Sequence, residues 1–252
     1  MNNVNEVFQK IFQEKQRDSQ KKIENYLNKQ GEKEIHDLRT SIRRLESAYI
    51  IFPDSFKRKK IDDFVSACKL LFRKNSAVRD FDVIISKLLN YGFTDDSDSV
   101  RYLIQKKEKN IQEILKLAKN LSKKNISHLK EGNAEKIIPK FEKTISLLLE
   151  KIQNLLPVVS SDKSKIEELH FMRKTVKKLR YILEIDPNDS YRHLIIKMKL
   201  LQNLLGTIHD CDMMIDFLKK YSKKFPELES FIFREEENRN QIYKKLSNSL
   251  SD

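Results

Sequence analysis

Two short stretches of this sequence each place a histidine and two cations at the spacing of a single helix face. At 100° per residue, the three side chains of each set lie on one side of a helix. They form the first stripe, His36, Arg39 and Arg43, and the second stripe, His170, Arg173 and Lys177. Guanidinium groups bind phosphate oxygens through paired hydrogen bonds, and an ammonium adds a mobile point charge. The pattern therefore indicates recognition of an anion.

Apolar residues occupy the opposite face of both segments, with Leu38 and Ile42 behind the first stripe and Met172 and Val176 behind the second. A single stripe of this kind is usually the solvated face of an amphipathic helix. The same residue types in the same register, found twice, favour a function instead. Like charges four residues apart repel each other, so each stripe favours an anion that its cations share.

Further cations lie beside the two stripes or on the segments that follow them. On the flanks of the stripes are Arg44, Lys174, Lys178 and Arg180. A second group, one segment further on, consists of Lys69, Arg73 and Lys199. We include all seven in the predicted anion site. The basic run at residues 57–60 has no counterpart in the second half, and a solvated charge run explains it.

The composition favours an all-helical, soluble protein. The 252 residues include only 4 glycines, too few for folds that need many tight turns, and 50 Lys and Arg against 37 Asp and Glu give a net charge of +13. Cys68 and Cys211 are too far apart in sequence to suggest a disulfide framework or a thiolate metal site. No stretch of about 18 apolar residues occurs. We expect a cytosolic protein with no membrane contact.

Apolar periodicity, interrupted by breakers such as Gly92, Pro157 and Gly206, predicts ten helices. Their expected ranges are 2–29, 32–52, 55–75, 80–91, 97–125, 134–156, 163–185, 189–205, 210–223 and 226–250.

Two matches at similar offsets indicate an internal duplication. His36 and His170 begin similar stretches 134 positions apart, and the Asp80 and Asp210 regions match 130 positions apart. We therefore predict one domain made of two pseudo-symmetric helical bundles, residues 1–133 and 134–252. If the bundles face each other, both stripes would line one central basic groove, whose field would attract a polyanion.

Two aspartate pairs, Asp80 with Asp82 and Asp210 with Asp212, fall where we expect new helices to begin. N-capping is the simpler interpretation of both pairs. The alternative is a metal site formed by His209, Asp210 and Asp212, or a metallophosphohydrolase centre that combines His36 and Asp37 with His209 and Asp210. Arg79 stands at the position that matches His209, and a cation at a ligand position argues against a metal. No glycine-rich phosphate loop or nucleophile elbow is present, so we expect neither catalysis nor a cofactor.

The motifs at residues 36–45 (HDLRTSIRRL), 170–181 (HFMRKTVKKLRY) and 204–212 (LLGTIHDCD) together resemble the CHAD family, the conserved-histidine α-helical domain. The resemblance covers nearly the whole chain. It implies two helical bundles around a basic cavity, binding of inorganic polyphosphate and association with polyphosphate granules. It also implies that the two stripes are the inward-facing set. The chain departs from the family pattern in two places, with Asn75-Ser76 where Leu-Gly is usual and His209 where Asn is common.

We therefore expect a stand-alone, non-enzymatic protein that binds inorganic polyphosphate. Two alternatives stay open at this point. A net charge of +13 also suits a nucleic-acid-binding helical protein, although the stripes lack the interleaved aromatic rings on which bases stack. A metal-dependent phosphohydrolase that uses the His–Asp pairs is the other alternative.

Overall fold

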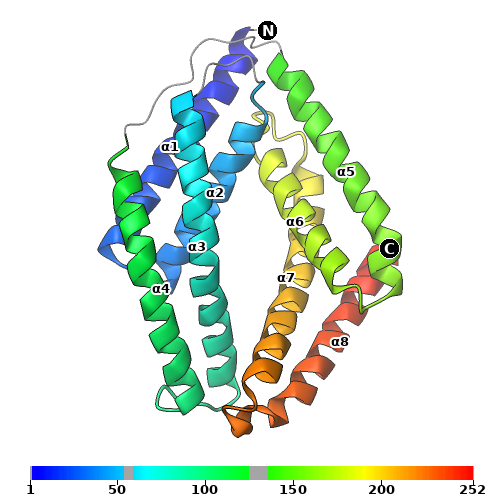
Figure 1. Ribbon diagram of the computed structural model, residues 1–252. Coiled ribbons are helices and arrows are strands. Elements are labelled where there is room, and N and C mark those ends of the chain that lie inside the picture. The colour runs from blue at the N-terminus through cyan, green and yellow to red at the C-terminus, as the bar shows by residue number, and fades with distance from the viewer. Residues whose placement is uncertain (1, 54–58, 125–135, 252) are drawn as a thin grey trace. The chain divides into compact units, whose positions relative to one another are not determined.

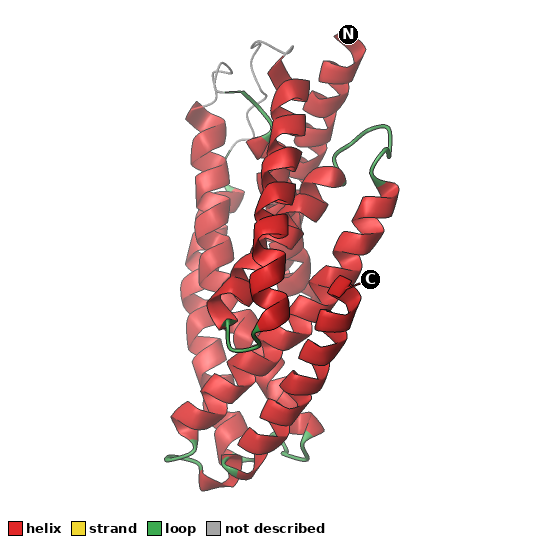
Figure 2. Ribbon diagram, turned by 90° about the vertical axis from the view of Figure 1, so that its right-hand side faces the viewer, coloured by secondary structure: helices red, strands yellow, loops and turns green. Residues whose placement is uncertain are grey.

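The computed structural model describes residues 2–53, 59–124 and 136–251. Within these ranges the chain is helical and contains no strand (Figure 2), which confirms the all-α prediction. The helices are α1 (Asn2–Asn28), α2 (Glu32–Ile50), α3 (Lys59–Asn90), α4 (Asp98–Ser122), α5 (Ile137–Ser161), α6 (Ile166–Leu183), α7 (Arg192–Tyr221) and α8 (Ser230–Ser251), with a 3-10 turn at Pro226–Leu228. None of these helices has an apolar stretch long enough to cross a membrane.

The chain divides into two compact units. Unit 1 consists of Met1–Asp82, Leu103–Ile145 and Glu184–Asp189, and unit 2 of Val83–Tyr102, Ser146–Leu183 and Ser190–Asp252. Both units are therefore assembled from segments that are distant in sequence. The first stripe belongs to unit 1 and the second stripe to unit 2.

In unit 1, α1 and α2 lie side by side (Figure 1). The fully buried ring of Phe12 stands 5.4 Å from that of Phe52, and Phe8 packs 5.5 Å from Phe141 at the start of α5. The Lys140 ammonium donates a hydrogen bond of 2.7 Å to the Phe52 carbonyl oxygen. These contacts fix α2, the helix that carries the first stripe.

In unit 2, α7 packs against both α6 and α8 (Figure 1). The α6 residues Met172, Val176 and Leu179 are fully buried. On α8, the Tyr243 hydroxyl donates a hydrogen bond of 2.8 Å to the Val159 carbonyl oxygen of α5. The second stripe is therefore on a helix whose opposite face is part of the core.

The two stripe helices begin in similar ways. Glu32 and Glu34 occupy the first turn of α2, and Glu167 and Glu168 occupy the first turn of α6. Carboxylates at this end stabilise a helix because they oppose the positive end of its dipole. Each histidine therefore lies just after an acidic first turn, where its helix becomes basic.

The structure corrects two predicted breaks. The ranges 55–75 and 80–91 form one helix, α3, and 189–205 and 210–223 form one helix, α7. Asn75 lies inside α3 and is fully buried. The apolar side chains around it keep the helical spacing of a core face, so the helix continues through this position. Gly206 lies within α7, where a glycine weakens a helix by only about 1 kcal/mol relative to alanine.

A third predicted break was also wrong. Pro157 lies inside α5, which continues to Ser161. Gly92, in contrast, ends α3 as expected, with a positive φ of 96° that favours glycine. The predicted break at Gly132 and the first half of the basic run, residues 57–58, lie outside the described residues.

Candidate functional site

The first stripe lies on the polar face of α2, as the spacing predicts. Leu38 and Leu45 on the opposite face are fully buried and Ile42 nearly so, whereas the His36 side chain is exposed. Arg39 and Arg43 are half-buried. The first stripe therefore runs from an exposed imidazole to two partly sheltered guanidinium groups.

Arg39 is held in place by α3. Its Nη1 atom donates hydrogen bonds to the Phe72 carbonyl oxygen at 3.1 Å and to Ser76 Oγ at 3.0 Å. Its Cζ atom lies 4.3 Å from the centre of the Phe72 ring. A guanidinium over an aromatic face is stabilised by the quadrupole of the ring.

Arg43 lies over the same ring, with its Cζ atom 4.8 Å from the ring centre. Phe72 therefore gathers two like charges that stand one helical turn apart. Because their repulsion opposes this arrangement, the ring supplies attraction that keeps both groups on the same side of α2. The result is a compact patch of positive charge within unit 1.

The second stripe is arranged differently, because its histidine contacts another histidine. His170 Nδ1 lies 3.2 Å from Nδ1 of His209 on α7, and the ring centres are 4.6 Å apart. One ring must donate the proton of this hydrogen bond and the other must accept it. His209 was weighed as a metal ligand from the sequence but was not included in the predicted anion site.

Both imidazoles favour the neutral form. Burial lowers the pKa of His170, and the nearby Lys174, Arg173 and Lys177 lower it further. Burial also lowers the pKa of His209, to about 3, with the same cations and His170 adding to the effect. At pH 7 the second stripe is therefore a neutral pair of rings surrounded by three cations.

The flanking cations differ in their surroundings. Arg44 Nε lies 3.8 Å from Glu184, and Lys69 Nζ lies 3.3 Å from Glu46. The other members of this predicted group, apart from Arg180, are exposed on α3, α6 and α7: Arg73, Lys174, Lys178 and Lys199.

Arg180 is the member of the predicted set whose position least suits ligand binding. Only 9% of its surface is exposed, and its Nε atom donates a hydrogen bond of 2.8 Å to Gln202 Oε1. Its Cζ atom lies 4.1 Å from the centre of the Tyr181 ring. These contacts favour a packing role between α6 and α7.

The aspartate pairs are not N-caps, because both lie inside helices, and this corrects the favoured sequence interpretation. Asp82 on α3 pairs with Lys107 on α4, and Asp212 on α7 pairs with Arg239 on α8. The aspartates stand 130 positions apart and their partners 132. The same kind of ion pair therefore braces each unit.

These contacts also bear on the alternative of a metal site. Asp212 is engaged with Arg239, and His209 is engaged with His170. Across the part of the chain that the structure describes, no group of three or more His, Cys, Asp or Glu side chains is arranged to hold a metal ion.

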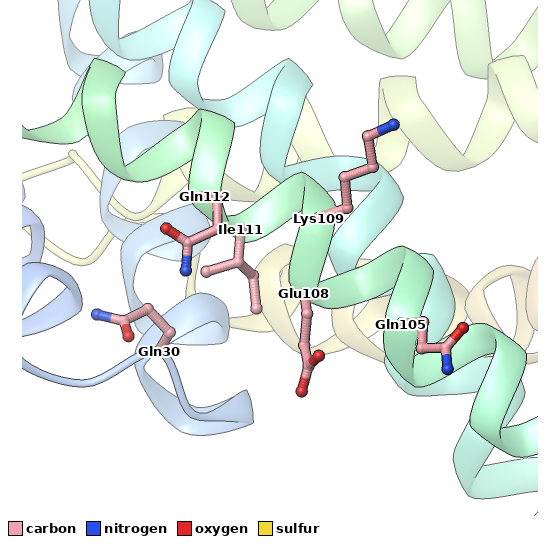
Figure 3. Close-up of a pocket in the computed structure, with 6 residues that line it drawn as sticks. All are labelled: Gln30, Gln105, Glu108, Lys109, Ile111 and Gln112. Atoms are coloured by element: carbon pink, nitrogen blue, oxygen red, sulfur yellow. The ribbon is translucent and has the colours of Figure 1, made fainter.

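A hollow of about 500 Å³ lies elsewhere in unit 1 (Figure 3). Its lining residues come from α4 and from the connection between α1 and α2: Gln30, Gln105, Glu108, Lys109, Ile111 and Gln112. Figure 3 shows polar amide and carboxylate side chains along this surface. It contains no stripe residue, so it is not the site that the sequence predicts.

The family model described as the CHAD domain matches residues 10–219, which is most of the chain. This chain belongs to the CHAD family. A crystal structure of the CHAD domain from the plant Ricinus communis is similar in fold, with a TM-score of 0.61 at 14% sequence identity. The similarity covers 98% of this chain and 91% of the plant domain. No curated protein matches the sequence.

The sequence analysis of this CHAD domain missed three contacts between helices. Phe72 supports Arg39 and Arg43, His209 contacts His170, and Gln202 accepts a hydrogen bond from the flanking Arg180. A signal was nevertheless present for two of these residues, because Phe72 and Gln202 stand 130 positions apart in the predicted repeat. The two matching segments therefore differ at this position, with an aromatic residue in the first half and an amide in the second.

Proposed function

We propose that this CHAD protein binds inorganic polyphosphate through its two stripes and catalyses no reaction on it. The observation that carries the proposal is the gathering of Arg39 and Arg43 over the single ring of Phe72. Two guanidinium groups fixed side by side form a strong positive patch, and phosphoryl oxygens match their paired donors. Membership in the CHAD family supports the same ligand class.

Polyphosphate suits these stripes better than nucleic acid does. Proteins that bind single strands offer aromatic faces on which bases stack. Here the Phe72 face is occupied by guanidinium groups, and Tyr181 is buried beneath Arg180. A ligand made only of phosphoryl units needs no such platform.

Affinity should come largely from charge. A polyphosphate chain carries about one negative charge per phosphoryl unit, and each contact with a cation releases a condensed counterion, as in nucleic-acid binding. We further propose that both stripes bind the same polyphosphate chain. Association with polyphosphate granules in the cell would follow from such binding.

Competition binding tests the proposed ligand. Labelled long-chain polyphosphate is bound to the protein and challenged with DNA or RNA at equal phosphate concentration. We expect nucleic acid to displace little of the label. Equal displacement per charge would support the nucleic-acid alternative and contradict the proposal.

An activity assay tests the absence of catalysis. Polyphosphate and triphosphate are incubated with the protein and added Mg²⁺ or Mn²⁺, and released phosphate is measured. We expect none above background. Release that is abolished by Asp210→Ala would establish the phosphohydrolase alternative instead.

A further inference from the structure

The contact between His170 and His209 gives unit 2 a feature that the described part of unit 1 lacks. Residue 79 stands 130 positions before His209 and is an arginine, and Arg79 pairs with Glu32. His36, the counterpart of His170, is exposed on α2. Of the two stripes, the second is therefore the one that combines its histidine with another imidazole from the neighbouring helix.

The geometry of the pair leaves one nitrogen of His170 for a ligand. Nδ1 of His170 is engaged with Nδ1 of His209 at 3.2 Å. The other ring nitrogen, Nε2, is then the atom with which His170 can contact an anion. It serves this purpose only when it carries a hydrogen, because a bare imidazole nitrogen would repel a phosphoryl oxygen.

The charged groups that act on the two rings are cations on α6, together with the opposing ring on α7. Lys174, Arg173 and Lys177 lower the pKa of His170 and also that of His209. A bound polyanion offsets these cations, so it favours a proton on the pair. Binding of the polyanion therefore favours uptake of a proton by the pair of His170 and His209.

We propose that His209 is a positioning residue for polyphosphate binding, and that its hydrogen bond to His170 makes the affinity of the second stripe rise as the pH falls. This inference rests on the proposed function. The Nδ1–H group of charged His170 donates a hydrogen bond to Nδ1 of His209, and its Nε2–H group donates a hydrogen bond to a phosphoryl oxygen. The added proton comes from solvent, and no covalent bond changes.

His209 suits the accepting role because it keeps its lone pair. Burial lowers the pKa of His209 to about 3, so between pH 5 and pH 8 any proton that the pair gains resides on His170. The direction of the effect follows from linkage. Binding raises the pKa of His170 above its value in the free protein, so protons are taken up on binding and acid favours the complex.

The test follows His170 directly by NMR on histidine-labelled protein, with and without polyphosphate of defined length. The ring signals are assigned with single variants. In the wild-type protein we expect polyphosphate to raise the midpoint of the His170 titration. We also expect binding that is severalfold stronger at pH 6 than at pH 8. A midpoint that rises by about one pH unit on binding sets a limit of about tenfold, which is reached only below the lowered pKa of His170 in the free protein.

Two variants separate a positioning role from a packing role. His209→Phe keeps a ring but removes both nitrogens, and we expect it to flatten most of the pH dependence. His209→Asn keeps a hydrogen-bonding side chain and should restore much of it. Loss of packing alone would lower affinity equally at every pH.

The results that overturn the inference differ from those that overturn the proposed function. Wild-type protein that binds polyphosphate with no movement of the His170 midpoint would disprove the role of His209 and leave the function standing. A His209→Phe profile that matches wild type would do the same. Wild-type protein that fails to bind polyphosphate at pH 6 and pH 8 would disprove the function itself.

Discussion

The two stripes of this protein carry similar side chains on different supports. In unit 1, Arg39 and Arg43 lie over the ring of Phe72, and Arg39 is further fixed by Ser76. In unit 2 the position that matches Phe72 is Gln202, which accepts a hydrogen bond from the buried Arg180 instead. In unit 1 an aromatic ring therefore supports two cations of the stripe, whereas the residue at the matching position in unit 2 makes a polar contact with Arg180 beside the stripe.

The difference has a functional consequence. Phe72 fixes the permanent charges of Arg39 and Arg43, so the contribution of these two arginines to affinity should depend on salt far more than on pH. The second stripe places titratable rings among its cations, so its affinity should depend on both. Substitutions in the stripes and in their supports should therefore differ widely in effect.

The largest effect should come from removing one arginine from each stripe. Arg39→Ala combined with Arg173→Ala should weaken polyphosphate binding by several kcal/mol, because a hydrogen bond to a charged group contributes about 1.5–3 kcal/mol. Folding should survive, since the Phe72 carbonyl oxygen that Arg39 contacts also accepts from Ser76. Calorimetry measures the affinity and circular dichroism the fold.

A matched control is the exposed pair Lys59 and Lys60 at the start of α3. Replacing both with alanine removes the same charge and should weaken binding far less. Equal losses in the two double variants would mean diffuse surface attraction rather than binding at the stripes.

The ion pairs that brace the units should differ in their contribution to stability. The Asp212 and Arg239 side chains are 12% and 9% exposed, whereas Asp82 and Lys107 are 6% and 23% exposed. Asp212→Asn strands a buried guanidinium and should lower the free energy of unfolding by about 3 kcal/mol. Asp82→Asn should have a smaller effect, because the Lys107 ammonium can reach water.

Urea unfolding of both variants measures this contrast. A loss from Asp82→Asn that equals or exceeds that from Asp212→Asn would show that burial of the cation does not decide the stability of these braces.

Phe72→Leu should weaken polyphosphate binding by about 1 kcal/mol, because a cation–π contact contributes about 0.5–1 kcal/mol at partly exposed sites. The fold should change little. Gln202→Leu at the matching position should instead reduce stability, since it removes the oxygen that accepts the hydrogen bond from the buried Arg180 Nε. Measuring the affinity and the melting temperature of both variants distinguishes the role of Phe72 from that of Gln202. Phe72→Tyr is the conservative control. Equal affinity losses in Phe72→Leu and Gln202→Leu would contradict a role of the Phe72 ring in polyphosphate binding.

The smallest effect should come from Asp37, which lies next to His36 and accepts a hydrogen bond of 2.9 Å from Lys22. Its counterpart in the second stripe is the exposed Phe171. Asp37→Asn removes a negative charge beside the first stripe and should raise affinity less than threefold or so at low salt, with no gain at high salt. The free energy of unfolding should fall by less than about 1 kcal/mol. Weaker binding of Asp37→Asn at low salt would contradict the proposal that polyphosphate binds at the first stripe.

The sequence predicted the local features of this structure well. Which residues of α2 and α6 face the core depends only on helical spacing, so Leu38, Met172 and the stripes opposite them were placed correctly. Helix ends were less predictable. Asp80 and Gly206 are typical of helix termini, yet packing of the apolar residues around them keeps α3 and α7 continuous.

The supports of the stripes could not be predicted because they depend on contacts between helices. The position of Phe72 beneath two arginines requires the way in which α3 packs on α2, and the bond between His170 and His209 requires α7 beside α6. No periodicity within a single helix contains this information.

The most direct test of the central claim is a calorimetric titration with polyphosphates of defined length at two salt concentrations. Binding of one chain by both stripes predicts that affinity rises with length and then levels off at one chain per protein, with a steep loss of affinity at the higher salt concentration. An affinity per phosphoryl unit that does not depend on length, with several chains bound to each protein, would contradict it.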